Sequence, residues 1–120
     1  MPDDPLILIV EDERAIVRFL VASLTRQGYR LRVAESGQQA IAMIDSRAPD
    51  LILLDLGLPD IDGIDIIDHV RSSSNLPIIV LSARDRENDK IDALDRGADD
   101  YLAKPFGVGE LAARLRVALR

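Results

Sequence analysis

LILLDLGLPDIDG, residues 51–63, is the stretch that decides the fold, because a run of four apolar residues ends there on an acid, Asp55. Four residues are too few for a helix, and Gly57, Pro59 and Gly63 follow at once, so the run predicts a buried strand. In an open parallel sheet, ligands bind in the crevice beyond the carboxyl ends of the strands. We therefore expect Asp55 to lie where the chemistry of this protein takes place.

The rest of the chain repeats the same pattern of an apolar strand followed by a helix. Further apolar runs predict strands at 6–10, 31–34, 76–81 and 100–103. Apolar residues at helical spacing predict helices over about 13–27, 36–49, 64–70, 91–97 and 111–119, with Gly28 and Gly97 as stops. Apolar strands that alternate with helices are typical of a parallel sheet covered on both faces. The sequence therefore predicts an α/β three-layer sandwich with five parallel strands.

Length and composition limit the class of protein. A length of 120 residues suits one domain, placed at 1–120, which can bury roughly two thirds of the surface of its unfolded chain. A net charge of -6 excludes nonspecific binding to nucleic acid, which needs clustered Lys and Arg. The absence of cysteine, and of a secretory signal in the opening residues MPDD, fits a cytoplasmic protein. No apolar run approaches the ~20 residues of a membrane span, so we expect no membrane contact.

Polar residues follow four of the predicted strands, and parallel strands bring them to one edge of the sheet. These residues are Glu11 and Asp12, Asp55, Ser82, and Lys104. Acids from neighbouring strands form an oxygen site for a hard cation, with Mg²⁺ (or Mn²⁺) favoured. Lys104 can offset the negative charge and reach a phosphoryl oxygen, and the Ser82 hydroxyl can donate to another. The combination indicates phosphoryl transfer, in which positioning and charge neutralisation do most of the work.

Each of these residues, taken singly, has an ordinary structural explanation. An acid at a strand end often caps the next helix, and a serine there is commonly a turn residue. Lys104 alone would be an exposed lysine, and Tyr101 alone a half-buried aromatic residue of the core. Only their convergence on one edge favours a functional site.

At these spacings the chain resembles the receiver domain of two-component response regulators over essentially its whole length. The segments that carry the resemblance to the OmpR/PhoB group, and within it to potassium-response regulators, are LDLGLPDIDG, IVLSAR, DKIDALDRGADDYLAKPFGVGEL and ARLRVALR. The resemblance implies a flavodoxin/CheY-like fold with strand order 2-1-3-4-5. It also implies a winged-helix DNA-binding domain beyond residue 120.

The resemblance assigns a role to each residue of the predicted site. It implies that Asp55 accepts a phosphoryl group from a sensor histidine kinase, as an acyl phosphate. Asp12 and Asp55 ligate Mg²⁺ directly, Glu11 does so through water, and Gly57 does so through its backbone carbonyl. Lys104 pairs with the phosphoryl group. Such a domain is not an enzyme in the usual sense, because it catalyses only its own phosphorylation and dephosphorylation.

Three further residues are implied to aim the lysine and to switch the domain. Pro105 follows a cis peptide bond, a conformation largely restricted to X-Pro bonds. Ser82 moves to bond the phosphoryl oxygen, and Tyr101 turns into the space that Ser82 vacates.

The resemblance also implies an output surface on the fourth helix, the fifth strand and the last helix, where the family builds a symmetric dimer. Its residues are Lys90, Ile91, Ala93, Leu94, Asp99, Asp100, Glu110, Ala113 and Arg114. We expect Ile91, Leu94 and Ala113 to form the apolar centre of this surface, because a two-fold interface uses one patch twice.

Ion pairs across that interface are expected from Lys90 to Glu110 and from Asp100 to Arg114, where they set the register more than the affinity. The dimer then places two DNA-binding domains on a repeated half-site. The genes controlled in this way are expected to be those of potassium transport.

Three positions depart from the common pattern of the family. Gly57 stands where many receivers carry a bulkier side chain, and Arg84 lies two residues after Ser82. Both flank the route of the attacking water, and so bear on the lifetime of the acyl phosphate. Ser82 replaces the commoner threonine, which keeps the hydroxyl and loses a methyl group.

Two other classes of function remain open at this point. A metal-dependent phosphohydrolase also uses an aspartate nucleophile at a strand end, but it needs a second aspartate where Gly57 stands. A free-standing receiver, or one that only docks partners, would share the fold and lack the DNA-binding domain. Dinucleotide binding is excluded, because no G-x-G-x-x-G follows the first strand.

Overall fold

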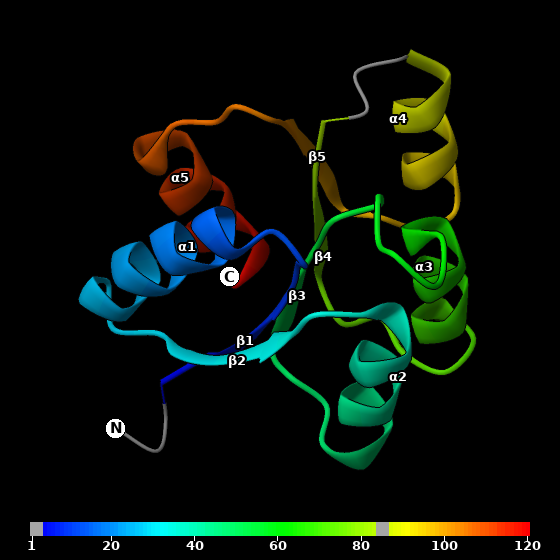
Figure 1. The fold of residues 1–120 in the computed structure, drawn as a ribbon, viewed down its shortest axis with the longest axis horizontal. Helices are drawn as coiled ribbons and strands as arrows, with labels where there is room; N and C mark the ends of the chain where they lie inside the picture. The colour runs from blue at the N-terminus through cyan, green and yellow to red at the C-terminus, as the bar shows by residue number, and fades with distance from the viewer. Residues whose placement is uncertain (1–3, 84–86) are drawn as a thin grey trace.

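The computed structural model, which describes residues 4–83 and 87–120, contains a five-stranded parallel sheet in the order β2-β1-β3-β4-β5 (Figure 1). The strands are β1 (Leu6–Val10), β2 (Arg30–Ala34), β3 (Leu51–Leu54), β4 (Ile78–Ser82) and β5 (Asp100–Ala103). The helices are α1 (Arg14–Arg26), α2 (Gly37–Ser46), α3 (Gly63–Arg71), α4 (Glu87–Asp95) and α5 (Val108–Ala118). The predicted fold class and strand order are confirmed.

Helices cover both faces of the sheet, so the strands are buried on both sides. Leu51 and Leu53 of β3 face a core that α1 and α5 complete, and Ile52 and Leu54 face the core under α2, α3 and α4 (Figure 1). All four residues of β3 are buried, which explains why the strand is apolar throughout instead of alternating. The two cores isolate the middle of the sheet from water and leave the strand ends for polar residues.

Two glycines end helices where the sequence predicted a stop. Gly28 after α1 and Gly97 after α4 have φ angles of 93° and 115°, a left-handed conformation that suits glycine. The predicted helix and strand limits agree with the structure to within a few residues. The largest shift at the start of a strand is in β4, which begins at Ile78 instead of Leu76, because Pro77 has no N–H to donate to a ladder.

One sequence prediction lies outside the described residues. Arg84, predicted to flank the path of attacking water, belongs to the undescribed segment 84–86. Among the residues that are described, the longest helix has 13 residues, and none is long and apolar enough to cross a bilayer.

The turn from β3 into α3 is closed by a backbone contact that requires glycine. The Gly63 N–H donates to the Leu56 carbonyl at 3.0 Å. A Cβ atom at Gly63 would lie 2.6 Å from the Leu56 Cα and 2.9 Å from the Asp55 carbonyl oxygen, and backbone atoms cannot easily move aside. The loop that starts at Asp55 is therefore packed closely against its own end.

We expect Gly63→Ala to destabilise the protein by about 1–3 kcal/mol, because the added methyl group overpacks the backbone at Leu56. Gly109→Ala is the matched control, since Gly109 lies in α5 with open space around it. Alanine is more favourable than glycine in a helix by up to about 1 kcal/mol, so this variant should be no less stable than the wild type. Urea unfolding of the two variants measures both effects. Equal stability of Gly63→Ala and the wild type would show that the turn is not tightly packed.

Candidate functional site

The carboxyl ends of β1, β3, β4 and β5 meet at one edge of the sheet, and the backbone brings their polar residues into line. The Asp55 N–H donates to the Val10 carbonyl at 3.0 Å, which places the residue after β3 beside the end of β1. The Lys104 N–H donates to the Ser82 carbonyl at 2.8 Å, which joins the end of β5 to the end of β4. The sequence prediction that these strand ends converge is confirmed.

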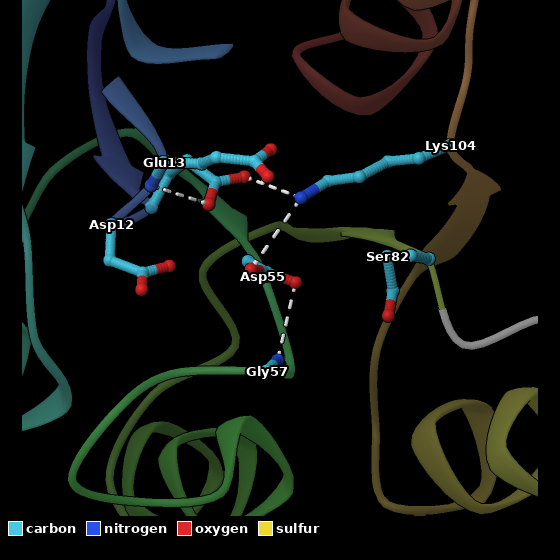
Figure 2. Close-up of a pocket in the computed structure, with 8 residues that line it drawn as sticks. Asp12, Glu13, Asp55, Gly57, Ser82 and Lys104 are labelled. Carbon is cyan, nitrogen blue, oxygen red and sulfur yellow. Dashed lines mark hydrogen bonds and ion pairs between the residues drawn. The ribbon is translucent and has the colours of Figure 1, made fainter. Parts of the chain in front are cut away.

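Three carboxylates gather at this edge, and one ammonium group, that of Lys104, lies beside two of them (Figure 2). One oxygen from each of Glu11, Asp12 and Asp55 lies within 4.8 Å of the others. The Lys104 Nζ atom is 2.6 Å from Glu11 Oε1 and 3.5 Å from Asp55 Oδ2. Glu11 is 2% exposed and Asp55 8%, whereas Asp12 is exposed. Negative charge therefore exceeds positive charge in a partly buried place.

A pocket of about 300 Å³ opens above this cluster. Its wall is formed by Glu11, Asp12, Glu13, Asp55, Gly57, Ser82, Ala83 and Lys104. Within it, Asp55 Oδ1 accepts the Gly57 N–H at 3.2 Å, and the acids and Ser82 lie on opposite sides of Asp55 (Figure 2). Asp55 is thus oriented by backbone below and by a cation beside it.

Burial and neighbouring charges shift the pKa values of the central pair. Burial raises the pKa of Glu11 above 4.5, and the nearby Asp55 adds to this, although the Lys104 hydrogen bond acts in the opposite direction. Burial also acts to lower the pKa of Lys104. The hydrogen bond with Glu11 and the charge of Asp55 outweigh that effect, so the Lys104 pKa is raised. Lys104 is therefore a fixed positive charge at neutral pH.

The cluster has the composition of a cation site. Carboxylate oxygens are the ligands that Mg²⁺ and other hard divalent ions prefer, and three of them can reach one ion here. A divalent cation would also relieve the repulsion between the two buried acids. The residues present therefore fit the metal that the sequence predicted.

The residues implied to aim and switch the site lie close to it. The Lys104–Pro105 peptide bond is cis, as the resemblance implied. Ser82 is 1% exposed and lines the pocket wall. Tyr101 is 7% exposed and packs in the core under α2, α3 and α4. Its ring is directed inward in this structure.

The predicted output surface is partly exposed. Ile91 and Leu94 of α4 are 46% and 39% exposed, and Ala113 of α5 is half-buried. Ala93 was expected on this surface, but it is fully buried in the core, because a small side chain lets α4 pack closely on the sheet. Lys90 is exposed. An apolar patch formed by Ile91 and Leu94 is therefore accessible on α4.

The acids and arginine predicted to pair between subunits have partners within one chain. The Arg114 Nη1 atom is 3.2 Å from Asp100 Oδ2, and its Nη2 atom is 3.3 Å from Glu110 Oε2. Asp99 Oδ2 lies 2.9 Å from Arg71 Nη2 of α3. The ion pairs across a dimer interface remain predictions, and forming them requires these contacts to rearrange.

Two residues of the site region were missed from the sequence. Glu13 lines the pocket, and its backbone N–H donates to Glu11 Oε2 at 3.2 Å. Asp60, in the loop after Asp55, accepts two backbone N–H groups at the start of α2. The acidic run Glu11–Glu13 signalled the first. Nothing local to Asp60 indicates a partner 22 residues away.

The parallel five-stranded fold and the acidic pocket at its edge define a signalling receiver. The chain matches the response regulator receiver domain over residues 7–116 and belongs to that family. It is 61% identical over 114 residues to the KDP operon transcriptional regulatory protein KdpE of Escherichia coli (strain K12), covering 95% of this chain and 51% of that protein. It is 48% identical over 115 residues to KdpE of Mycobacterium tuberculosis (strain H37Rv), covering 96% and 51%.

The chain therefore spans about half the length of the curated relatives it matches. Solved structures agree on the fold. The BeF3-activated N-terminal receiver domain of Klebsiella pneumoniae RstA superposes with a TM-score of 0.92 at 34% identity, covering 96% of this chain and 98% of that one. The receiver domain of the Francisella response regulator 1452 gives a TM-score of 0.91 at 34% identity, covering 97% of each chain. The predicted family resemblance is confirmed.

We expect Lys104→Met to lower the free energy of unfolding at neutral pH by about 1–3 kcal/mol, because the buried Glu11 carboxylate loses its charged partner. The pKa of Glu11, already raised in the folded state, rises further without the ammonium group. Protonation of Glu11 therefore favours the folded variant. The deficit is largest at neutral pH and shrinks as the pH falls toward 4.5.

Lys90→Met is the control, since Lys90 is the only other lysine in the sequence and lies exposed on α4. We expect a change within about 0.5 kcal/mol at either pH. Urea unfolding without divalent ions, at neutral pH and near pH 4.5, measures both variants. A Lys104→Met deficit that does not depend on pH would contradict the electrostatic role of the pair.

Proposed function

We propose that Asp55 is the phosphoryl acceptor of this receiver domain and that its phosphorylation controls transcription. The observation that supports this is the position of the Asp55 carboxylate, 8% exposed on the pocket wall and 3.5 Å from the Lys104 ammonium. A carboxylate becomes an effective nucleophile toward phosphorus when the charge that repels an incoming phosphoryl group is neutralised. Lys104 supplies part of that neutralisation, and a divalent cation held by the acids would supply the rest.

The chemistry is transfer of a phosphoryl group from a phosphohistidine of a sensor histidine kinase. One Asp55 oxygen forms a bond to phosphorus while the phosphorus–nitrogen bond to the imidazole breaks, and the electron pair of that bond stays on the nitrogen. Because the other ring nitrogen carries a proton, the imidazole leaves as neutral histidine, and Asp55 becomes an acyl phosphate. Lys104 holds a phosphoryl oxygen, and the Ser82 hydroxyl, from the same pocket wall, donates to another. Mg²⁺ or Mn²⁺ would be held by Asp12 and Asp55 directly, by Glu11 through water, and by the Gly57 carbonyl, and would offset charge on the phosphoryl oxygens.

The switch that follows uses Ser82 and Tyr101. Ser82 is buried at the pocket wall, and the Tyr101 ring is already packed inward in this structure. Movement of Ser82 toward the phosphoryl group would leave space beside it, which favours the inward position of the Tyr101 ring and with it one arrangement of the surface of α4, β5 and α5. The exposed Ile91 and Leu94 then form, with Ala113, the apolar centre of a symmetric dimer.

The output is regulation of genes by a DNA-binding domain beyond residue 120. Relatives about twice as long as this chain, one of them described as the KDP operon transcriptional regulatory protein, support a further domain that acts in transcription. The winged-helix fold of that domain and potassium-transport genes as its target follow from the resemblance to potassium-response regulators. The net charge of -6 agrees with DNA contacts made outside this domain. Family membership supports a cytoplasmic location and a kinase partner. The whole process makes this chain a switch and not a multiple-turnover enzyme.

We expect intact-mass measurement after treatment with acetyl phosphate and Mg²⁺ to show one added phosphoryl group on the wild type and none on Asp55→Ala. Asp95→Ala, which removes an exposed acid at the end of α4, is the control and should gain the group as the wild type does. Omitting the divalent ion should prevent uptake. Uptake by Asp55→Ala would assign the acceptor role to another residue. Multiple turnover on a phosphate ester would instead favour the alternative function, a metal-dependent phosphohydrolase.

We expect Leu94→Asp to prevent dimerisation of the phosphorylated domain, because an unpaired charge would be buried at the centre of the interface. Ala42→Asp adds the same charge to an exposed alanine of α2, which α3 separates from α4 (Figure 1), and this variant should dimerise normally. Sedimentation after phosphorylation compares the two variants. If phosphorylated Leu94→Asp sediments as a dimer, as the wild type is expected to do, the interface does not include Leu94.

A further inference from the structure

The loop that follows Asp55 is tethered at its tip to a helix from a different part of the chain. Asp60 lies on the loop between β3 and α3. Its Oδ1 atom accepts the Gly37 N–H at 2.8 Å, and its Oδ2 atom accepts the Gln38 N–H at 2.9 Å. Both oxygens of one carboxylate thus bind the first two residues of α2, and the loop is held to that helix.

The tether completes the cap of α2. The N–H of Gln39, the third residue of the helix, donates to Ser36 Oγ at 3.2 Å. The first three amides of α2 therefore have side-chain acceptors, one of them local and two supplied by Asp60. Amides at a helix N-terminus favour a negative acceptor, and the hydrogen bonds from Gln38 and Gly37 lower the pKa of Asp60. Asp60 is therefore charged at neutral pH.

A close packing contact reinforces the hydrogen bonds. A Cβ atom on Gly37 would lie 2.9 Å from Ile61 Cβ, so the start of α2 presents a bare backbone against which Ile61 rests. Gly37 is buried at this contact, although the neighbouring Asp60 is exposed. The tip of the loop is therefore fixed to α2 by the hydrogen bonds of the Asp60 carboxylate and by the packing of Ile61 against Gly37.

The other end of the loop is closed beside Asp55. The Gly63 N–H donates to the Leu56 carbonyl at 3.0 Å, which leaves residues 57–62 as a loop with a fixed base and a tethered tip. Between the two anchors lies Gly57, whose N–H binds Asp55 Oδ1 at 3.2 Å. The conformation of the loop therefore decides where Gly57 stands relative to Asp55 (Figure 2).

We propose that Asp60 is a positioning residue for the site at Asp55, because its tether to α2 holds the loop, and with it Gly57, against the acceptor carboxylate. The inference rests on the proposed function, in which Asp55 takes up the phosphoryl group and Gly57 belongs to the metal site. Asp60 touches neither the metal nor the phosphoryl group in this role. It acts through the loop.

The test is the affinity for Mg²⁺ alone, measured by isothermal titration calorimetry at a temperature where all variants are folded. Removing an outer residue that orients metal ligands typically weakens binding by about 10-fold to 100-fold, and we expect Asp60→Ala to raise the Mg²⁺ Kd by about 10-fold. Its initial rate of phosphoryl uptake from acetyl phosphate at low Mg²⁺ should fall by a similar factor and recover in part at saturating Mg²⁺.

Ser36→Ala is the matched control, since it removes the other cap of the same helix N-terminus and does not touch the loop. It should lower the Tm as Asp60→Ala does and leave the Mg²⁺ Kd unchanged. Asp60→Asn keeps one oxygen for one of the two amides and should bind Mg²⁺ with intermediate affinity. This conservative variant also provides the test if Asp60→Ala does not fold.

Equal Mg²⁺ Kd values for Asp60→Ala and Ser36→Ala, or wild-type affinity in both Asp60 variants, would overturn the positioning role. If either result is found and the wild type is nevertheless phosphorylated on Asp55, the proposed function still holds. A wild type that takes up no phosphoryl group on Asp55 overturns the proposed function, and the role of Asp60 with it.

Discussion

Repulsion between buried carboxylates at the end of an apolar sheet is the constraint on which the site depends. Glu11 and Asp55 are almost completely buried, and Asp12 has an oxygen within 4.8 Å of both. In a place of low dielectric, like charges at this separation cost far more than they do in water. One ammonium group, that of Lys104, offsets part of the cost at 2.6 Å from Glu11. The remaining negative charge would favour a divalent cation in the pocket.

The strand order of the sheet holds these mutually repelling carboxylates together. Glu11 and Lys104 are 93 residues apart in the chain, and only the parallel order β1-β3-β4-β5 brings their strand ends to one edge. The apolar interior of the strands supplies the stability, because helices bury the sheet on both faces. A charged edge is thus supported by a well-packed centre, and the loop after Asp55 is further held by Asp60 and Gly63.

The pocket and the proposed output surface are connected by adjacent elements of the fold. Ser82 at the pocket wall and Tyr101 in the core lie on adjacent strands, β4 and β5, which are paired directly. Tyr101 packs in the same core as Ala93 of α4, so movement of the ring bears on the helix that carries Ile91 and Leu94. Arg114 holds Asp100 and Glu110 within one chain on the same surface. One pair of strands and one shared core therefore lie between the pocket wall and the exposed apolar patch.

The sequence by itself determined the alternation of strands and helices, the glycine stops and the acids at strand ends. These features are set by local patterns, such as the run Leu51–Leu54 that ends on Asp55. The tertiary structure alone decided which groups meet across the chain. It paired Lys104 with Glu11 more closely than with Asp55, and it joined Asp60 to α2. It also buried Ala93, which was expected at the surface. The physical reason is that hydrogen bonds and charge contacts between distant residues depend on strand order and packing, which periodicity along the chain does not encode.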